Sequence, residues 1–552
     1  MKEKSVNIDL MFPPESGETE KNTFATISPA SVHNLELEYL AGLICPYNQE
    51  FALKILSKPP TDINVIKYRQ DILEDFLQIP ELEAILYKSI HTIFNNAKSI
   101  YAKIGSTQSF IEINENLEHI DSFIECINAC HSFYERHYPR LRSEGAKAVA
   151  QALEDKYRSE DFKGLVAEVE QLKDTFKNGI RSVTFGINFD EHMRPMKVAL
   201  LSSSNEYFRE KTLFERIFSK NEVTEPLSEI YSRKSKDGEL DASNKVLFNE
   251  LDSMAGEYIR HFNASLRSYY SSSVDFLLKI EPQINFYVGA AQLAERSHKL
   301  GLPVCRPKIL PKEKRTFRCT EMYDLVYACK LFNSILGGRF SAPEIKTNDC
   351  EIDGIVILTG ANNGGKTTFT RAAGIDQVLA QCGMYVTAQS AEISAVDSIF
   401  VHFPKEEEVG INTSRFTEEC REFGETTKHA GAYSLILMNE SLSSTTPTEC
   451  LIIAEELMKI FSFMGARVIF TTHIHELIGK KDEIDKAGGK SPLTSMIAQC
   501  DERGQPTYRI VKGVPDQLRN ARYIFERFGI SFEEYLRQSQ SQQSDSISKL
   551  NF

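Results

Sequence analysis

The 552-residue sequence lacks any run of about 18 consecutive apolar residues, which is roughly what a membrane-spanning helix needs. Its first 21 residues, MKEKSVNIDLMFPPESGETEK, are polar and acidic, unlike the basic and then apolar start of a secretory signal peptide. We therefore expect a globular protein of the cytoplasm with no membrane partner. A hydrophobic fraction of 41% is sufficient for real cores, and the length suggests three or more domains.

Closely paired cysteines and an excess of positive charge are also lacking. The 11 cysteines are scattered without C-x-x-C spacing, which favours reduced thiols over disulfides or a zinc site. A formal net charge of −13 argues against a protein that coats nucleic acid over its whole surface. A local basic face stays compatible with this charge balance.

Helical periodicity dominates the first half of the chain instead. Asp62 is a candidate N-cap before an amphipathic run, and a later set of apolar residues alternates spacings of four and three. A near-heptad pattern over residues 248–269 predicts a long helix or a coiled-coil-like arm that ends at Pro282. The alternating set, which predicts a helix–helix seam, consists of Ile113, Leu117, Ile120, Ile124 and Ile127.

The most informative stretch is GIVILTGANNGGKTT, residues 354–368. It contains the phosphate-binding pattern G-x-x-x-x-G-K-[ST], preceded by β-branched residues that predict a strand and followed by a helix-like run. In such a loop the backbone N–H groups surround phosphate oxygens, Lys366 supplies a positive charge and Thr367 offers a hydroxyl to Mg²⁺. The stretch therefore predicts a nucleoside-triphosphate site, and the adjacent Lys and Thr disfavour a glycine turn that serves packing alone.

Two further strands are predicted to end in polar groups. In SLILMNES, residues 434–441, Glu440 follows a buried apolar run and is our candidate general base. Asn439 stands where a P-loop protein usually has the aspartate that serves Mg²⁺. In ARVIFTTHIHEL, residues 466–477, His473 follows a third strand, where it reads the γ-phosphate, positions water, or is only a hydrogen-bonded structural residue.

Taken together, these motifs resemble the MutS family of DNA mismatch-repair ATPases. The resemblance is carried by TGANNGGKTTFTRAAG, GMYVTAQSAEISAVDSIF, LILMNES and FTTHIHEL, in that order. Weaker similarity covers NVIKYRQDILEDF near the front and YRIVKGVPDQLRNARYIFERFGI, residues 508–530, which looks like a C-terminal helical element.

The resemblance implies a multi-domain protein in which a mainly helical lever and core region precedes an α/β P-loop ATPase domain of the ABC type. We expect a disordered tail over residues 1–22 and a helical core, lever and clamp-like region over 23–304, with a strand pair near 180–202. The ATPase domain would span 305–530 and a polar tail 531–552. Residues 305–318, with six Lys or Arg and two prolines, are interpreted as the linker that enters the ATPase domain.

The resemblance also implies roles for individual residues. Glu440 would activate water, His473 would sense the γ-phosphate, and Thr367 and Asn439 would serve Mg²⁺. Ser414, in the segment INTSRFTEECRE, would reach the partner's nucleotide in a homodimer that closes around mismatched or otherwise structured DNA. The residues expected to bind ATP are Gly360, Ala361, Asn362, Asn363, Gly364, Gly365, Lys366, Thr367, Thr368 and Ser414.

Three departures from the family pattern restrict this transfer. No counterpart of the family's N-terminal mismatch-reading domain is recognised, Asn439 removes one negative charge, and ESLSSTTPTE, residues 440–449, lacks the family's Gly-Arg-Gly. We therefore expect an ATP-dependent DNA-binding ATPase. Two alternatives stay open: an ATP-gated clamp on branched DNA or an RNA complex, and a nucleotide-binding interaction protein with very low hydrolysis.

Overall fold

The computed structural model divides the chain into two compact units. We call Met1–Ile8, Ile79–Arg142 and Ala146–Ile284 the helical unit, and Asp9–Gln78, Ser143–Gly145 and Asn285–Phe552 the sheet unit. Within the described residues no helix is both long enough and apolar enough to cross a bilayer. The structure describes residues 8–14, 24–102, 110–176, 182–204, 277–336, 344–361, 363–403, 415–442, 446–501, 503 and 505–514.

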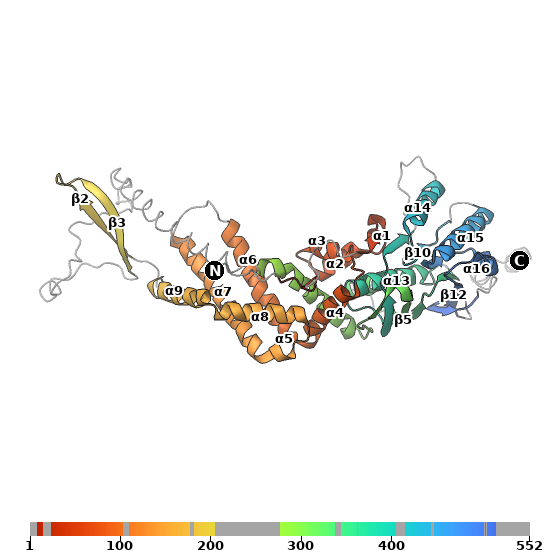
Figure 1. Ribbon diagram of the computed structural model, residues 1–552, viewed down its shortest axis with the longest axis horizontal. Coiled ribbons are helices and arrows are strands. Elements are labelled where there is room, and N and C mark those ends of the chain that lie inside the picture. Colours follow the sequence, from red (N-terminus) through yellow and green to blue (C-terminus); the bar gives the residue numbers. More distant parts are fainter. Residues whose placement is uncertain are drawn as a thin grey trace, which may run out of the picture. The chain divides into compact units, whose positions relative to one another are not determined.

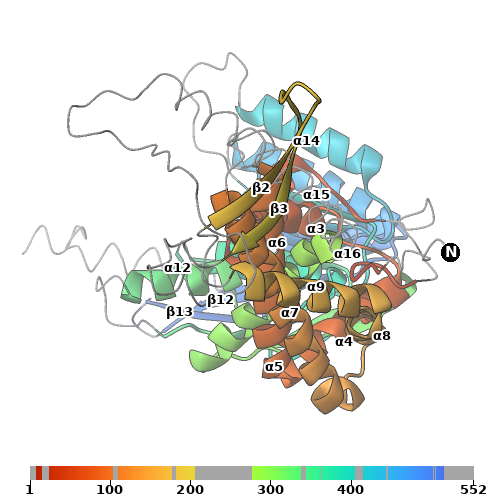
Figure 2. The same cartoon turned by 90° about the vertical axis from the view of Figure 1, so that its left-hand side faces the viewer.

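The helical unit is built on long amphipathic helices and one hairpin (Figures 1 and 2). In α7, Ile120, Ile124 and Ile127 of the predicted seam are buried, as their four-and-three spacing requires. The near-heptad pattern over residues 248–269 lies outside the described residues. The helices are α5 (Pro80–Leu82), η1 (Glu83–Tyr87), α6 (Lys88–Ala102), α7 (Phe110–His137), η2 (Tyr138–Arg140), α8 (Glu144–Arg158) and α9 (Glu160–Phe176).

The hairpin joins β2 (Ser182–Phe189) and β3 (Pro195–Ser204) in antiparallel register, from Ser182↔Ser204 to Phe189↔Pro195. It lies where β-branched residues and alternation predict a strand pair. Between the strands, Asp190 Oδ1 accepts the backbone N–H groups of His192 and Arg194, which closes the turn.

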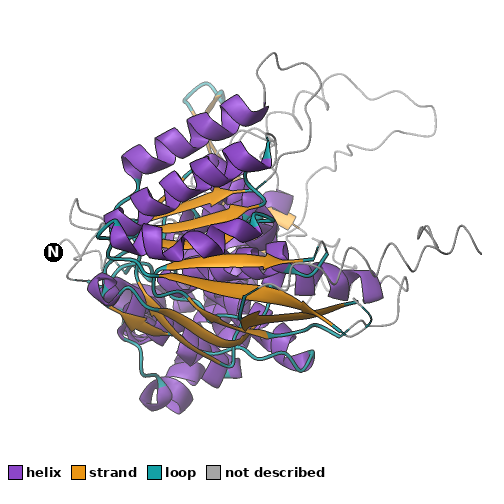
Figure 3. Ribbon diagram, turned by 90° about the vertical axis from the view of Figure 1, so that its right-hand side faces the viewer, coloured by secondary structure: helices purple, strands orange, loops and turns teal. Residues whose placement is uncertain are grey.

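The sheet unit contains a seven-stranded sheet in the order β1-β9-β10-β11-β7-β12-β13. All neighbours pair in parallel except β13, which is antiparallel to β12. Figure 3 shows helices lying against the strands of this unit. The strands are β1 (Thr26–Ile27), β9 (Ser398–His402), β10 (Leu435–Asn439), β11 (Arg467–Thr471), β7 (Ile355–Gly360), β12 (Leu493–Cys500) and β13 (Pro506–Lys512).

The central strands are buried on both faces, because helices cover both. Side chains such as Ile436, Met438 and Phe470 point to the core that includes α15 (Pro447–Met464). The intervening side chains face α13 (Lys366–Gln381), where a Cβ on Gly374 would lie 2.7 Å from Leu437 Cδ1. A strand that is buried on both faces needs a near-continuous apolar run, and β10 has one in LILM, residues 435–438.

A four-stranded sheet lies in the same unit, in the order β4-β8-β5-β6. Its strands are β4 (Lys308–Leu310), β8 (Ser390–Ser394), β5 (Phe317–Met322) and β6 (Asn348–Glu351). The interpretation of residues 305–318 as a linker is therefore wrong. Its Lys and Arg side chains alternate with buried Ile309 and Phe317, and two of them, Lys308 and Arg318, pair with Glu392 of β8.

The N-terminal segment also departs from expectation. Within the expected tail, Leu10 and Met11 are buried, and their carbonyls accept hydrogen bonds from Tyr287 Oη at 2.6 Å and Arg69 Nε at 2.9 Å. Strand β1, expected in the helical region, pairs with β9 of the seven-stranded sheet. These contacts join residues far apart in the chain, so a low local apolar content did not reveal them.

Of two predicted helix boundaries, the structure agrees with one and differs from the other. Asp62 precedes α4 (Ile63–Gln78), and its Oδ1 accepts the N–H of Asn64 at 2.8 Å, so the predicted start is confirmed. Pro282 does not end a helix, since residues 277–299 are helical around it.

The remaining helices are α1 (Pro29–Asn34), α2 (Leu37–Ile44), α3 (Gln49–Leu56), η3 (Lys312–Lys314), α12 (Leu325–Leu336), α14 (Arg415–His429), η4 (His475–Lys480) and α16 (Lys481–Lys486).

Asp376 of α13 is a fully buried carboxyl whose Oδ1 accepts the N–H and Oγ1–H of Thr387, both at 2.9 Å. Burial raises the pKa of Asp376 to about 7, against the opposing effect of the Thr387 hydrogen bonds and with a further rise from nearby Asp324. Folding therefore takes up a proton between about pH 4 and pH 7. The stability that this proton provides is present below pH 4 and is lost as the pH rises through 7.

We expect Asp376→Asn to flatten this pH dependence, because asparagine keeps Oδ1 and carries no charge. Between pH 5 and pH 8 the wild type should lose up to about 3 kcal/mol of unfolding free energy, at about 1.4 kcal/mol for each pH unit between pH 5 and the pKa of about 7. Urea unfolding at pH 5 and pH 8 measures the difference, with the exposed Asp482→Asn as the matched control. An Asp376→Asn slope equal to that of the wild type would contradict the assignment.

Candidate nucleotide-binding site

Three parallel strands end side by side at one edge of the sheet. Strand β11 lies between β10 and β7, with Asn439 opposite Thr471 and Thr471 opposite Leu358. The polar residues that follow these strands are therefore neighbours, although they come from separate parts of the sequence. The carboxyl edge of a parallel sheet is where α/β proteins bind ligands.

The loop between β7 and α13 has a backbone that side chains would obstruct. Gly360 has φ 131°, and a Cβ there would lie 2.8 Å from both Cβ and O of Ala498. Gly365 has φ 85° and Asn363 φ 60°, so three residues of the loop have positive φ. The N–H of Gly364 donates to Ala361 O at 3.1 Å, and Asn362 lies outside the described residues.

Lys366 is the first residue of α13 and is only 3% exposed. Its Nζ donates to Gly360 O at 3.0 Å and to Ala361 O at 2.9 Å, so the ammonium group lies within the loop. The carboxylate of Glu440 lies close by, with its Oε1 3.8 Å from Lys366 Nζ. Burial lowers the pKa of Lys366, and the charge of Glu440 opposes this shift.

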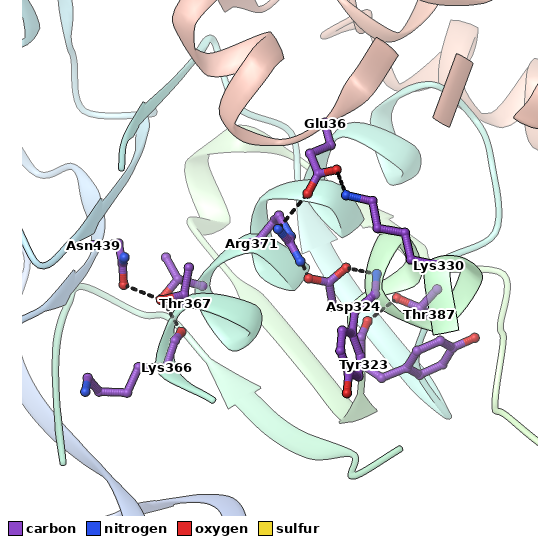
Figure 4. Close-up of polar contacts among 11 residues, drawn as sticks. Glu36, Tyr323, Asp324, Lys330, Lys366, Thr367, Arg371, Thr387 and Asn439 are labelled. Carbon is purple, nitrogen blue, oxygen red and sulfur yellow. Dashed lines mark hydrogen bonds and ion pairs between the residues drawn. The ribbon is translucent and has the colours of Figure 1, made fainter. Parts of the chain in front are cut away.

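Thr367 and Asn439 meet across the sheet edge (Figure 4). Thr367 Oγ1 donates to Asn439 Oδ1 at 3.1 Å, and Asn439 is buried whereas Thr367 is exposed. The next residue, Thr368, is half-buried on α13. A hydroxyl and an amide oxygen side by side are hard oxygen donors of the kind that Mg²⁺ accepts, so this pair fits that ion.

Glu440 has a left-handed backbone, with φ 48°, and its N–H donates to Thr471 O at 2.9 Å. This conformation is costly for a non-glycine residue, and the Glu440 side chain is 36% exposed. Oε1 lies 3.4 Å from Nε2 of His473, which is 45% exposed. The carboxylate therefore lies between an ammonium group and an imidazole.

The structure brings together most of the predicted residues, and two of them, Asn362 and Ser414, lie outside the described residues. The predicted residues that lie at this sheet edge are Gly360, Gly364, Gly365, Lys366, Thr367, Asn439, Glu440 and His473. Ser414 lies outside the described residues, and α14 begins directly after it at Arg415.

Sequence reasoning missed Arg371, one helical turn beyond Thr367. Its guanidinium donates to Asp324 Oδ2 at 2.7 Å and to Glu36 Oε1 at 2.8 Å, and Glu36 also pairs with Lys330 (Figure 4). Burial raises the pKa of Asp324, and Arg371 opposes that shift. No local sequence pattern indicates the ion-pair network of Arg371, because its members come from three distant segments of the chain.

Sequence reasoning also missed Tyr508 of β13. The side chain is 50% exposed, and its Cδ1 would lie 3.5 Å from a Cβ on Gly365, so the ring borders the start of α13. The stretch that contains Tyr508 was expected to begin a helical element, but residues 508–512 belong to β13, and residues 515–530 lie outside the described residues.

Comparison with known proteins gives two family matches. The model of the MutS2 N-terminal domain matches residues 61–300, and that of MutS domain V matches residues 356–517. Together they cover most of the chain between its terminal segments.

Individual relatives agree with these matches. The DNA mismatch repair protein MutS of Shouchella clausii (strain KSM-K16) is 25% identical over 522 residues, covering 86% of this chain and 54% of that protein. The protein of the same name from Streptococcus sanguinis (strain SK36) is 26% identical over 352 residues, covering 62% and 37%. Endonuclease MutS2 of Caldicellulosiruptor bescii is 28% identical over 180 residues, covering 32% and 22%. The chain thus matches about half or less of the length of these relatives.

These matches agree with the architecture. The MutS2 N-terminal match covers the described helices from α4 to α9, and the domain V match covers the strands and loops of the candidate site. The two family matches and the relatives establish that the chain belongs to the MutS family, and its helical region and mixed α/β sheets are consistent with this.

Proposed function

We propose that this protein binds ATP with Mg²⁺, hydrolyses it, and couples hydrolysis to clamp movement on mismatched or otherwise structured DNA. The observation that carries the ATPase part is the meeting of Lys366, Glu440 and the Thr367–Asn439 pair at one sheet edge. These groups are a phosphate-directed cation, a carboxylate base and oxygen donors for a divalent ion, and phosphoryl transfer to water requires all three.

The loop and α13 would bind the phosphates. The first turn of a helix leaves backbone N–H groups unpaired, and the helix dipole adds positive potential there. Lys366 adds a full charge, and its burial strengthens the attraction because little water screens it. Its contacts with Gly360 O and Ala361 O keep the ammonium group inside the loop.

Thr367 and Asn439 would hold Mg²⁺ through Oγ1 and Oδ1. When bound, the ion supplies charge neutralisation for the phosphate oxygens. Asn439 provides an oxygen without a negative charge, so the residues of this chain offer the ion a weaker electrostatic attraction than an aspartate would.

Glu440 would accept the proton of the attacking water. Its left-handed backbone directs the carboxylate into the site, and Lys366 and His473 lie within 3.8 and 3.4 Å of Oε1. The Lys366 ammonium group offsets the charge of the carboxylate. The position of His473 Nε2 beside Glu440 favours a role in orienting this base and in reading the γ-phosphate.

Tyr508 would contact the nucleobase. Its ring borders Gly365, where the phosphate-binding loop meets α13, and half of its surface is accessible. An exposed aromatic ring beside a phosphate site is suited to stack on a base, because every base has a π-face.

The DNA part of the proposal is supported by the printed names of two relatives, each a DNA mismatch repair protein. Filter binding with matched, mismatched and branched duplexes and structured RNA, with and without ATP, tests it. Preference for branched DNA or RNA would favour the first alternative substrate class. Tight ATP binding with negligible steady-state hydrolysis would favour a nucleotide-gated interaction protein, which the missing charge at Asn439 makes the second candidate.

We further propose that ATP joins two copies through the ATPase domains, with Ser414 completing the partner's site. Light scattering of the Glu440→Gln variant with ATP and Mg²⁺ is the test, because slow hydrolysis would preserve the complex. A monomer under these conditions would contradict the homodimer.

Asn439→Asp is expected to lower the Mg²⁺ concentration at half-maximal ATPase activity and to raise the maximum rate. The substitution keeps an oxygen next to Thr367 and adds the missing charge, while Glu440 is unchanged. ATPase rate as a function of Mg²⁺ concentration measures both quantities, with Asn64→Asp at an exposed position of α4 as a control for the same chemical change elsewhere. Superimposable curves, or a slower Asn439→Asp variant, would show that the amide is not at the metal.

A further inference from the structure

Tyr508 lies in an irregular part of β13. Between the pairs Ala498↔Ile510 and Cys500↔Pro506, β13 advances four residues while β12 covers two, so β13 bulges there. Tyr508 has φ 59°, a left-handed value that is a genuine outlier for an aromatic residue. Such a bulge re-aims a side chain, and such a backbone persists only when its surroundings hold it.

Asn348 of β6 stabilises this backbone conformation of Tyr508 through two hydrogen bonds. Its Nδ2 donates to Tyr508 O at 3.0 Å, and its Oδ1 accepts the N–H of Ile510 at 2.7 Å. One side-chain amide therefore binds the backbone on both sides of Arg509, as a neighbouring strand would. Asparagine suits this position because its amide is both donor and acceptor.

The support for Asn348 comes from the four-stranded sheet. Asn348 pairs with Met322 of β5, which is buried. Two contacts next to the amide reinforce the connection between β6 and β13: Lys512 Nζ lies 2.6 Å from Glu351 Oε2, and Arg509 Nη1 donates to Thr347 O at 3.3 Å. The position of the Tyr508 ring beside Gly365 thus depends on residues about 160 positions earlier in the chain.

We propose that Asn348 is a positioning residue for the nucleobase: it holds Tyr508 beside the phosphate-binding loop and so sets the affinity for the base without touching the nucleotide. This inference rests on the proposed ATP site. It assigns the affinity for ATP to two separable parts, a phosphate part at Lys366 and a base part at the Asn348–Tyr508 pair.

A double-mutant cycle with two ligands tests the proposal. ATP and inorganic tripolyphosphate, each with Mg²⁺, are titrated into the full-length wild type, Asn348→Ala, Tyr508→Ala and the double variant. We expect Tyr508→Ala to weaken ATP binding about tenfold and Asn348→Ala to weaken it by roughly three- to tenfold. Tripolyphosphate affinity should change less than about twofold, and the double variant should bind ATP as Tyr508→Ala does, because both changes remove one interaction.

Two conservative variants separate positioning from general stability. Tyr508→Phe keeps the ring and should bind ATP as the wild type does. Asn348→Asp keeps the acceptor for Ile510 N–H but loses the donor to Tyr508 O. It should therefore lose affinity for ATP and not for tripolyphosphate. If Asn348→Ala does not fold, Asn348→Asp replaces it in the cycle.

Each contrary outcome has a distinct meaning. Equal loss of ATP and tripolyphosphate affinity in the Asn348 variants, or losses that multiply in the double variant, would overturn the positioning role. A Tyr508→Ala protein with wild-type ATP affinity would overturn it too, while leaving the phosphate site intact. A wild type that binds neither ligand would instead refute the proposed function itself.

Discussion

Replacing Lys366 with alanine is expected to reduce ATP affinity by about 100-fold or more. The ammonium group is buried inside the loop, where its Nζ donates to the carbonyl groups of Gly360 and Ala361. A hydrogen bond to a charged group contributes about 1.5–3 kcal/mol, and each 1.4 kcal/mol is a factor of ten in affinity. Without it, only backbone dipoles and Mg²⁺ would oppose the phosphate charge.

The measurement is equilibrium binding of ATP with Mg²⁺, with the free energy of unfolding determined in parallel. That second measurement matters because the substitution leaves two loop carbonyls without their donor. Lys308→Ala is the matched control, since Lys308 is an exposed lysine of the four-stranded sheet in the same unit. A folded Lys366→Ala protein with unchanged ATP affinity would refute the phosphate site.

Replacing Glu440 with glutamine is expected to slow ATP hydrolysis by about 10²- to 10⁴-fold, the usual contribution of a general base, while ATP stays bound. Glutamine preserves size and keeps a side-chain oxygen near Lys366 and His473. It cannot take a proton from water. It also removes a negative charge beside the phosphates, so ATP affinity should be equal or higher.

Single-turnover hydrolysis and ATP binding, measured on the same preparation, separate these effects. Glu392→Gln, which changes an exposed carboxylate that pairs with Lys308, should hydrolyse ATP at the wild-type rate. Turnover of Glu440→Gln within about twofold of the wild type would mean that another residue is the base.

Much of the candidate site was predictable because its parts are local. The β-branched residues before Gly360 predict β7, the glycines with adjacent Lys and Thr predict the loop, and the helical run predicts α13, all within 27 residues. The apolar run before Asn439 likewise predicts β10. In each case the pattern depends on side chains within a few positions of one another, so one stretch of sequence contains the whole signal.

Other parts were not predictable because their partners are remote. Thr367 and Asn439 are 72 positions apart, and Asn348 and Tyr508 are 160 apart. Residues 305–318 resembled a linker because their prolines and charges are typical of one, yet pairing with β8 makes two strands of them. Strand β1 has only two residues, too few for any periodicity, and exists because β9 offers a free edge.

The family motifs, the order of the strand, loop and helix around Lys366, and the neutral residue at Asn439 can all be read from the sequence. The tertiary structure decided which of these groups meet. Parallel pairing of β10, β11 and β7 aligns their carboxyl ends, so Glu440 comes within 3.8 Å of Lys366. Side-chain type and local backbone preference are properties of a short segment, whereas the distance between two side chains is set by strand register and by the helices that pack between them.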